Sequence, residues 1–298
     1  MKVTKAKANA MLLLAAIIWG AGYIFSKQAT NAGMHAGLIN AIRGFIYAGL
    51  AYAFFHRTID HMSKQDLKIG LIAGGINFLG YQLQTIGLTD TTPANNAFLT
   101  AIYVVITPFI MWLFFREKPQ RKAYVAIIIC VLGMAVLTGV FTHGLSLHFG
   151  DLLTIASAGF YALQIVYFSG SATAVSPWII AFMLGITQGG LGLLSSLAFE
   201  TQTYASVHWV QGLVPVIILG IVSSFGAQTL QLVGQRYTDP TPAGLLLMTE
   251  SMFGSIFSVA LGFEPLTWNL VIGGGLIVVA LVVMQVGFRR LWLFKRRA

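Results

Sequence analysis

The chain has 298 residues, of which 57% are hydrophobic and only 9% are charged, and its formal net charge is +9 at pH 7. Soluble domains carry about 25% charged residues, so this composition excludes an ordinary soluble protein and indicates one that crosses a membrane many times. The single cysteine, Cys130, excludes an intrachain disulfide and a metal cluster built from cysteines.

Ten apolar runs follow one another along the chain, each long enough to cross the hydrocarbon core as a helix of about 20 residues. They cover 8–27, 35–55, 69–89, 93–115, 122–141, 150–168, 177–199, 211–234, 241–262 and 267–287. The N-terminal stretch MKVTKAKANAMLLLAAIIWGAG is similar to a signal peptide. We expect it to be retained as the first span, because its removal would spoil the charge pattern of the loops. The predicted fold class is therefore an all-α membrane protein with ten transmembrane helices.

The basic residues predict the orientation of these spans. If the N-terminus is cytoplasmic, sixteen of the 18 Lys and Arg residues fall in cytoplasmic segments and none falls in an external loop. Cytoplasmic loops of membrane proteins carry this excess, so we expect both termini, including the basic tail 288–298, in the cytoplasm. The positive charge thus indicates membrane topology and contact with lipid headgroups, and we expect no nucleic-acid partner. The two remaining basic residues, Lys27 and Arg43, lie at the end of a span and inside one.

Two similar segments predict an internal repeat. GYQLQTIGLTDTTPA at 80–94 and GAQTLQLVGQRYTDPTPA at 226–243 align Gln82 with Gln228 and, after three inserted residues, their Thr-Pro-Ala ends. Each repeat, 8–141 and 149–287, then holds five spans, and an odd number inverts the second repeat in the membrane. Inverted repeats are typical of secondary transporters, in which the solute site lies near the midplane. Duplication for stability alone is the other interpretation. In each Thr-Pro-Ala motif we expect threonine to cap a helix and proline to take its first position.

Three segments carry a family resemblance: IIWGAGYIFSKQA (17–29), ANNAFLTAIYVVITPFIMWLFFREKP (94–119) and LLLMTESMFGSIFSVALGFEPLT (245–267). They resemble the first, fourth and ninth helices of the EamA-type family in the drug/metabolite transporter superfamily. The resemblance covers nearly the whole chain as two EamA repeats and departs from the family at Ser251, where proline is common. It implies a central cavity lined by helices 1, 3, 4, 6, 8 and 9, peripheral helices 5 and 10, and export of small metabolites.

Two charged residues, Glu250 and Arg43, lie well inside predicted spans. At a rise of 1.5 Å per residue both are roughly 12–14 Å from a membrane face, so an ion pair between them is possible. Two interpretations of Glu250 stay open. It is either a carboxylate that carries protons or binds a solute amine, or a structural acceptor that holds helices together. Arg43 is either a ligand for a solute carboxylate or a structural partner.

Uncharged polar and aromatic residues complete the candidate site. Amides and hydroxyls inside membrane helices either bind a ligand or link helices, and aromatic rings either stack on a solute or pack. The candidates for the lining of a cavity are Trp19, Tyr23, Tyr81, Gln82, Asn96, Thr100, Tyr103, Tyr161, Gln164, Gln228 and Thr249.

Motifs of other classes are absent from the sequence. There is no Walker A motif, no HExxH and no histidine cluster, so we expect no ATP-driven pumping, cofactor or metal. The sequence predicts a multi-pass protein of the cell membrane that acts as a secondary active transporter for a small amphipathic metabolite such as an amino acid. We expect export by alternating access, protons as a possible coupling ion, and no obligate protein partner. The alternatives are an importer or facilitative exchanger of a nucleobase or vitamin and, more distantly, a membrane-embedded enzyme.

Overall fold

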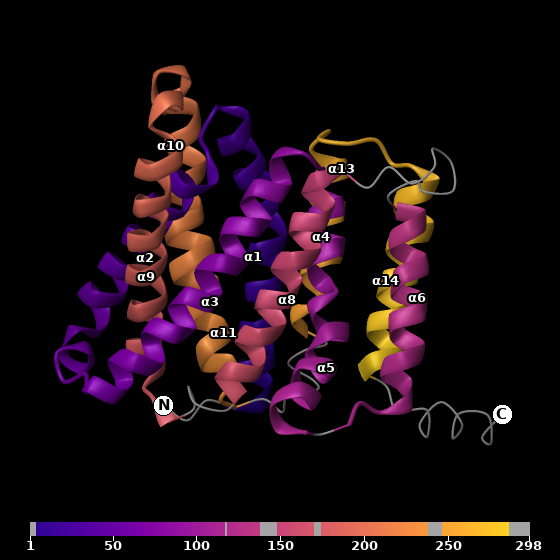
Figure 1. The fold of residues 1–298 in the computed structure, drawn as a ribbon, viewed down its shortest axis with the longest axis horizontal. Coiled ribbons are helices and arrows are strands. Elements are labelled where there is room, and N and C mark those ends of the chain that lie inside the picture. The colour runs from indigo at the N-terminus through magenta and orange to yellow at the C-terminus, as the bar shows by residue number, and fades with distance from the viewer. Residues whose placement is uncertain (1–3, 117, 138–147, 170–173, 238–245, 286–298) are drawn as a thin grey trace.

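The computed structural model describes residues 4–116, 118–137, 148–169, 174–237 and 246–285, and within these ranges it is helical without strands (Figure 1). Six of its helical stretches are long and apolar enough to cross a membrane, and Trp268–Ala280 is a shorter apolar helix. This confirms the prediction of an all-helical chain and agrees with a multi-pass membrane protein. The ten crossings and their orientation stay predictions.

The helices follow the predicted apolar runs in order. The first half contains α1 (Lys5–Asn31), α2 (Ala36–Ile59), α3 (Lys64–Thr89), α4 (Pro93–Ala101), α5 (Tyr103–Phe115) and α6 (Arg121–Leu137). The second half contains α8 (Phe149–Ser169), α9 (Pro177–Phe199), the short 3₁₀ helix η2 (Thr201–Ser206), α10 (Trp209–Ile218), η3 (Leu219–Ala227), α11 (Gln228–Gly234), α13 (Thr249–Ala260) and α14 (Trp268–Gln285). The second Thr-Pro-Ala motif at 241–243, parts of three predicted spans and the tail 288–298 lie outside the described residues.

Three of the predicted runs are interrupted as helices within the described residues, one of them, 241–262, at Met248 directly before α13. The run 93–115 divides at Ile102 into α4 and α5, and Pro108 inside α5 has no N–H to donate to the preceding turn. The run 211–234 passes from α10 into the wider π-helical η3 and then into α11. A π-helical segment changes the direction in which the following side chains point, and such segments are frequent at functional sites.

Polar side chains cap the starts of α2 and α4. Thr92 caps α4 as predicted by accepting a hydrogen bond from the Asn95 backbone N–H at 3.2 Å. Glu200 accepts from the backbone N–H groups of Gly37 and Leu38 at 2.7 and 2.9 Å, next to the start of α2. Glu264 accepts from the Ala94 N–H at 3.1 Å, at the start of α4. These carboxylates satisfy N–H groups that have no partner within their helix and lie at its positive end.

Lys27 ties α1 to the end of α3. Its Nζ donates hydrogen bonds to the backbone carbonyls of Leu88 at 2.7 Å, Thr91 at 2.9 Å and Thr89 at 3.3 Å. Carbonyls at the C-terminal end of a helix lack partners within it and carry partial negative charge. Lys27 therefore stabilises this helix end and joins α1 to the α3–α4 connection.

Close backbone contacts hold the helix pairs together. On α2, a Cβ at Gly44 would overlap the backbone of Gly189 on α9, so the two helices touch where both residues are glycine. Small residues at such crossings let membrane helices approach closely and gain dispersion energy. The α6–α14 pair at one side of Figure 1 is built in the same way, because a Cβ at Gly273 of α14 would overlap the Leu137 backbone of α6.

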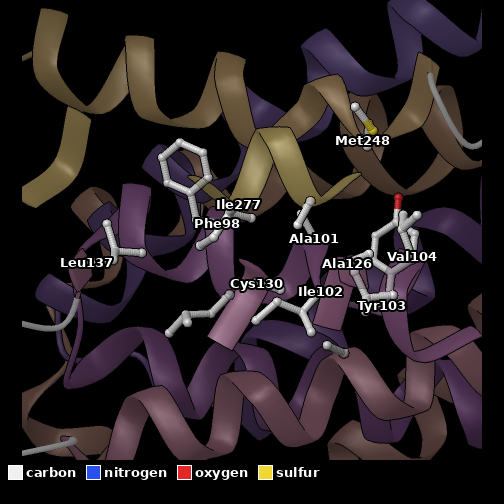
Figure 2. Packing of buried hydrophobic residues seen from close by; sticks show 14 of the residues in the cluster. Phe98, Ala101, Ile102, Tyr103, Val104, Ala126, Cys130, Leu137, Met248 and Ile277 are labelled. Carbon is white, nitrogen blue, oxygen red and sulfur yellow. The ribbon is translucent and has the colours of Figure 1, made fainter. Parts of the chain in front are cut away.

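A buried apolar cluster joins the α6–α14 pair to α4 and α5. Figure 2 shows Phe98 of α4, Tyr103 of α5 and Ile102 between these two helices. They lie together with Cys130 of α6 and Ile277 of α14. The Cys130 side chain is 1% exposed. The cluster is the apolar support behind the helices that carry Thr100 and Tyr103.

Candidate solute cavity

One cavity lies between the helices of the two halves. It is lined from α1, α2, α3, α4, α5, α8, η3, α11 and α13 by Trp19, Gly22, Tyr23, Ser26, Arg43, Tyr81, Gln84, Thr100, Tyr103, Tyr161, Gln164, Ile165, Leu219, Ser223, Gln228, Gln231 and Glu250. These elements include all six spans that the resemblance implied as the lining, namely 1, 3, 4, 6, 8 and 9. The second span also contributes, through Arg43.

The structure brings most of the sequence candidates together in this lining. Ten of the thirteen lie there, namely Trp19, Tyr23, Arg43, Tyr81, Thr100, Tyr103, Tyr161, Gln164, Gln228 and Glu250. They come from distant parts of the sequence, so the shared location is a property of the fold. Whether they bind a solute stays a prediction.

Three candidates lie outside the lining. Gln82 accepts a hydrogen bond from Asn40 Nδ2 at 2.9 Å and donates to Ser195 Oγ at 3.2 Å, so it joins α2, α3 and α9. Successive helical residues are 100° apart, so Gln82 cannot share the face of its neighbour Tyr81.

The other two misplaced candidates are Asn96 and Thr249. Asn96 donates to Thr154 Oγ1 at 2.8 Å, and this bond links α4 to α8. Thr249 donates from Oγ1 to the Leu246 carbonyl at 2.6 Å, as hydroxyls in helices often do. The predictions that these two residues line the cavity are therefore not met.

Gln84 is the main residue that the sequence analysis missed. Its Nε2 donates to Thr100 Oγ1 at 2.9 Å and to the Tyr23 hydroxyl at 3.4 Å, and its Oε1 accepts from the Tyr161 hydroxyl at 3.0 Å. It follows Tyr81 by three positions, and residues at this spacing share a helix face. The same spacing would have found Gln231 from Gln228 and Ser26 from Tyr23, whereas Ser223 carries no such signal.

Glu250 lies in the first turn of α13 with a side chain only 5% exposed. Within the described residues its carboxylate has no hydrogen-bond or ion-pair partner. Its helix packs directly on α1, where a Cβ at Gly20 would lie 2.7 Å from the Phe253 Cβ and 3.0 Å from the Glu250 carbonyl oxygen. Backbone packing against α1 therefore holds this turn of α13 at the cavity wall.

Arg43 is fixed by groups other than Glu250. Its Nε donates to Ser224 Oγ at 2.9 Å, and its Cζ lies 4.2 Å from the centre of the Tyr81 ring. A guanidinium over an aromatic face is stabilised by a cation–π interaction. No ion pair joins Arg43 to Glu250 in the described part of the chain, so the pair that the sequence allowed is not formed in this conformation.

Aromatic rings and the π-helical segment shape the rest of the wall. The Tyr81 and Tyr161 rings meet edge to face with centres 5.7 Å apart. Trp19 Nε1 donates a hydrogen bond to the Ser223 backbone carbonyl at 3.3 Å. The hydroxyl of the next residue, Ser224, accepts the hydrogen bond from Arg43 Nε. The π-helical η3 thus holds two cavity residues of the first half.

The cavity combines an acid, a base, amides and aromatic rings in a protected space. Most ligand sites are apolar pockets with a few polar groups that fix orientation. Within the described residues, no group of three or more His, Cys, Asp or Glu side chains is placed to hold a metal ion.

The chain is similar to known proteins over most of its length. The model of the EamA-like transporter family matches twice, at residues 6–139 and 148–286. A protein of Archaeoglobus fulgidus named as an uncharacterized transporter is 29% identical over 95% of this chain and 87% of its own length. Another uncharacterized transporter, from Methanothermobacter thermautotrophicus, is 24% identical over 85% of this chain and 79% of its own. One crystal structure shares the fold with a TM-score of 0.70 and 19% identity, over 96% of this chain and 99% of that one.

Proposed function

Since this chain belongs to the EamA-like transporter family, we propose that it is a secondary active transporter that exports a small amphipathic solute from the cell. The solute class that fits best is an amino acid or a related compound. Protons entering the cell drive export, and Glu250 carries them.

Alternating access is the mechanism that two similar halves support. The family model matches each half separately, and the polar lining of the cavity comes from both. With five spans each, the halves have opposite orientations, and exchange of their conformations opens the site to alternate sides of the membrane.

The observation that carries the proposal is the environment of Glu250. An acidic side chain inside a membrane protein is costly, and such residues commonly mark proton relays or solute sites. Glu250 lines the cavity without a partner among the described residues, so its carboxylate is available to a proton or a solute amine. A structural acceptor would instead be expected to have a donor within hydrogen-bonding distance.

The charges of the cavity fit a zwitterion. Glu250 offers a negative group and Arg43 a positive one, and the two are not neutralised by each other. The tyrosine rings and Trp19 supply apolar surface for a side chain. A solute with an amine, a carboxylate and an apolar side chain complements all three.

The test uses Glu250→Gln in proteoliposomes loaded with radiolabelled amino acids. We expect the variant to lose transport driven by a pH gradient because glutamine cannot carry a proton. Solute binding should be weaker but still measurable, since glutamine has a similar shape without the negative charge. Glu250→Asp, which keeps the carboxyl group, is the matched control. Equal pH-driven transport by wild type and Glu250→Gln would disprove the coupling role.

The direction is tested in growing cells. Overexpression should confer resistance to a toxic amino-acid analogue, because an exporter lowers its concentration in the cell. Increased sensitivity would mean uptake and would contradict export.

A further inference from the structure

A continuous chain of buried side-chain amides leads away from the cavity. Gln164 of α8 and Gln228 of α11 each donate Nε2 to the same atom, Asn77 Oδ1 of α3, at 2.9 Å. Asn77 is completely buried and does not line the cavity. The two cavity glutamines therefore converge on one asparagine behind the wall.

The chain continues beyond Asn77 in one direction. Asn77 Nδ2 donates to Gln188 Oε1 at 3.5 Å, and Gln188 Nε2 donates to Asn40 Oδ1 at 3.0 Å. The last links are those from Asn40 to Gln82 and from Gln82 to Ser195 Oγ. Each amide uses its NH₂ group toward the next residue.

This direction determines which atom of each glutamine is left without a partner in the chain of amides. An amide has one donor end and one acceptor end, so a glutamine that gives its NH₂ to Asn77 has its carbonyl oxygen left over. Five buried polar side-chain atoms in the described residues lack a hydrogen-bond partner, and of these only Gln228 Oε1 belongs to a residue of the cavity lining. Gln164 and Gln228 thus each keep an acceptor oxygen outside the chain of amides, and that of Gln228 is buried without a partner at a residue of the cavity wall.

We propose that Asn77 is a positioning residue for solute selection, since it turns the carbonyl oxygens of Gln164 and Gln228 toward N–H donors of the solute. The solute class is a primary amine, with the ammonium group of an amino acid as the best fit. The inference rests on the proposed function and deepens it. It also makes Glu250, an acceptor in its ionised form, a further group on the lining that suits an amine.

The test compares solutes that differ only at the amine. Purified protein is titrated by calorimetry with L-leucine, L-phenylalanine and L-tryptophan, each beside its 2-hydroxy acid and its unsubstituted carboxylic acid. We expect wild type to bind at least one amino acid about tenfold more tightly than its unsubstituted acid, because that acid leaves the two oxygens unpaired.

Two substitutions at Asn77 separate positioning from structure. Asn77→Leu removes the acceptor, so the glutamine amides can turn either end to the cavity and the preference should fall below about twofold. Asn77→Asp keeps an acceptor for both glutamines and should retain the preference. Ser195→Ala, at the far end of the chain of amides, removes a hydrogen bond without touching the cavity and is the matched control.

The outcomes distinguish the two proposals. A folded Asn77→Leu protein that keeps the full preference overturns the role of Asn77 and leaves the proposed amino-acid transporter standing. A wild type that binds amino acid and unsubstituted acid alike overturns the role of Asn77 and leaves a transporter of another solute. Binding of none of the nine compounds by wild type overturns the proposed solute class and the inference together. If Asn77→Leu does not fold, Gln228→Met is measured instead. It removes one acceptor at similar length, and an undiminished preference in it also overturns the inference.

Discussion

The cavity and the α6–α14 pair are both built from apolar helices, yet they differ in what they bury. Among the described residues, the buried polar side chains come from the other helices and the segments between them, and none comes from α6 or α14. Both regions use glycine for close packing, at Gly20 beside the cavity and at Gly273 in α14. Glycine contacts are thus found both around the cavity and in the α6–α14 pair, whereas buried polar side chains, which are costly, are found among the described residues around the cavity but not in the pair.

The largest effect is expected where close packing and the cavity coincide. In Gly20→Ala the new methyl group would lie 2.8 Å from the Gly254 backbone nitrogen as well as against Phe253, so α13 must move and take Glu250 with it. We expect pH-driven transport per folded molecule to fall about 100-fold, since displacement of a reacting group by about 1 Å has such effects. The measurement is flux in proteoliposomes normalised to folded protein.

Gly49→Ala in α2 is the control for Gly20→Ala, because no heavy atom outside its own helical surroundings lies within 4 Å of the added methyl group. It should transport at the wild-type rate. Normal transport by Gly20→Ala would mean that the position of α13 does not control the cavity.

The same substitution in the peripheral pair should separate stability from transport. In Gly273→Ala the methyl group would lie 2.6 Å from the Leu137 backbone nitrogen on α6. Overpacking of this kind costs about 1–3 kcal/mol, so the variant should unfold at lower SDS fraction in mixed micelles. Transport per folded molecule should remain close to that of wild type. A large loss of transport without loss of stability would show that the α6–α14 pair takes part in the transport cycle.

A smaller effect is expected from the anchoring of Arg43. Arg43→Lys keeps the charge but loses the planar group over Tyr81 and the Nε hydrogen bond to Ser224. We expect solute affinity, measured by calorimetry, to fall about tenfold, as for loss of a charge-assisted contact. Ser224→Ala removes the hydrogen bond alone and should lower affinity about threefold. Equal affinity in Arg43→Lys and wild type would show that Arg43 does not orient the solute.

The sequence predicted the helices well because the signals for them are local. Runs of apolar residues gave the positions of the helices, and the Thr92-Pro93 motif gave the start of α4. The candidate cavity residues were found mainly because polar and aromatic side chains are conspicuous in apolar helices. The family resemblance supplied which helices meet, which no local pattern could have given.

The sequence did not predict the details that depend on rotation and on contacts between distant helices. The repeat alignment points to Gln82, whereas the three-residue spacing from Tyr81 points to Gln84, and it is Gln84 that lines the cavity. Its repeat mate Gln228 does line the cavity, so equivalent positions in the two halves have different environments. The π-helical η3 in the second half is absent from α3 in the first, and it alters the direction of the side chains near Gln228.

The smallest effect is expected two residues beyond Gly273 on the same helix. Gly275 points about 200° away from Gly273, and an added methyl group would meet no heavy atom within 4 Å. Gly275→Ala should therefore raise the free energy of unfolding in SDS micelles by up to about 0.5 kcal/mol, because alanine loses less backbone freedom on forming a helix. Destabilisation as large as that of Gly273→Ala would contradict a lipid-facing surface for this part of α14. It would mean that another chain packs there, and the α6–α14 pair would then be an interface rather than the periphery of the molecule.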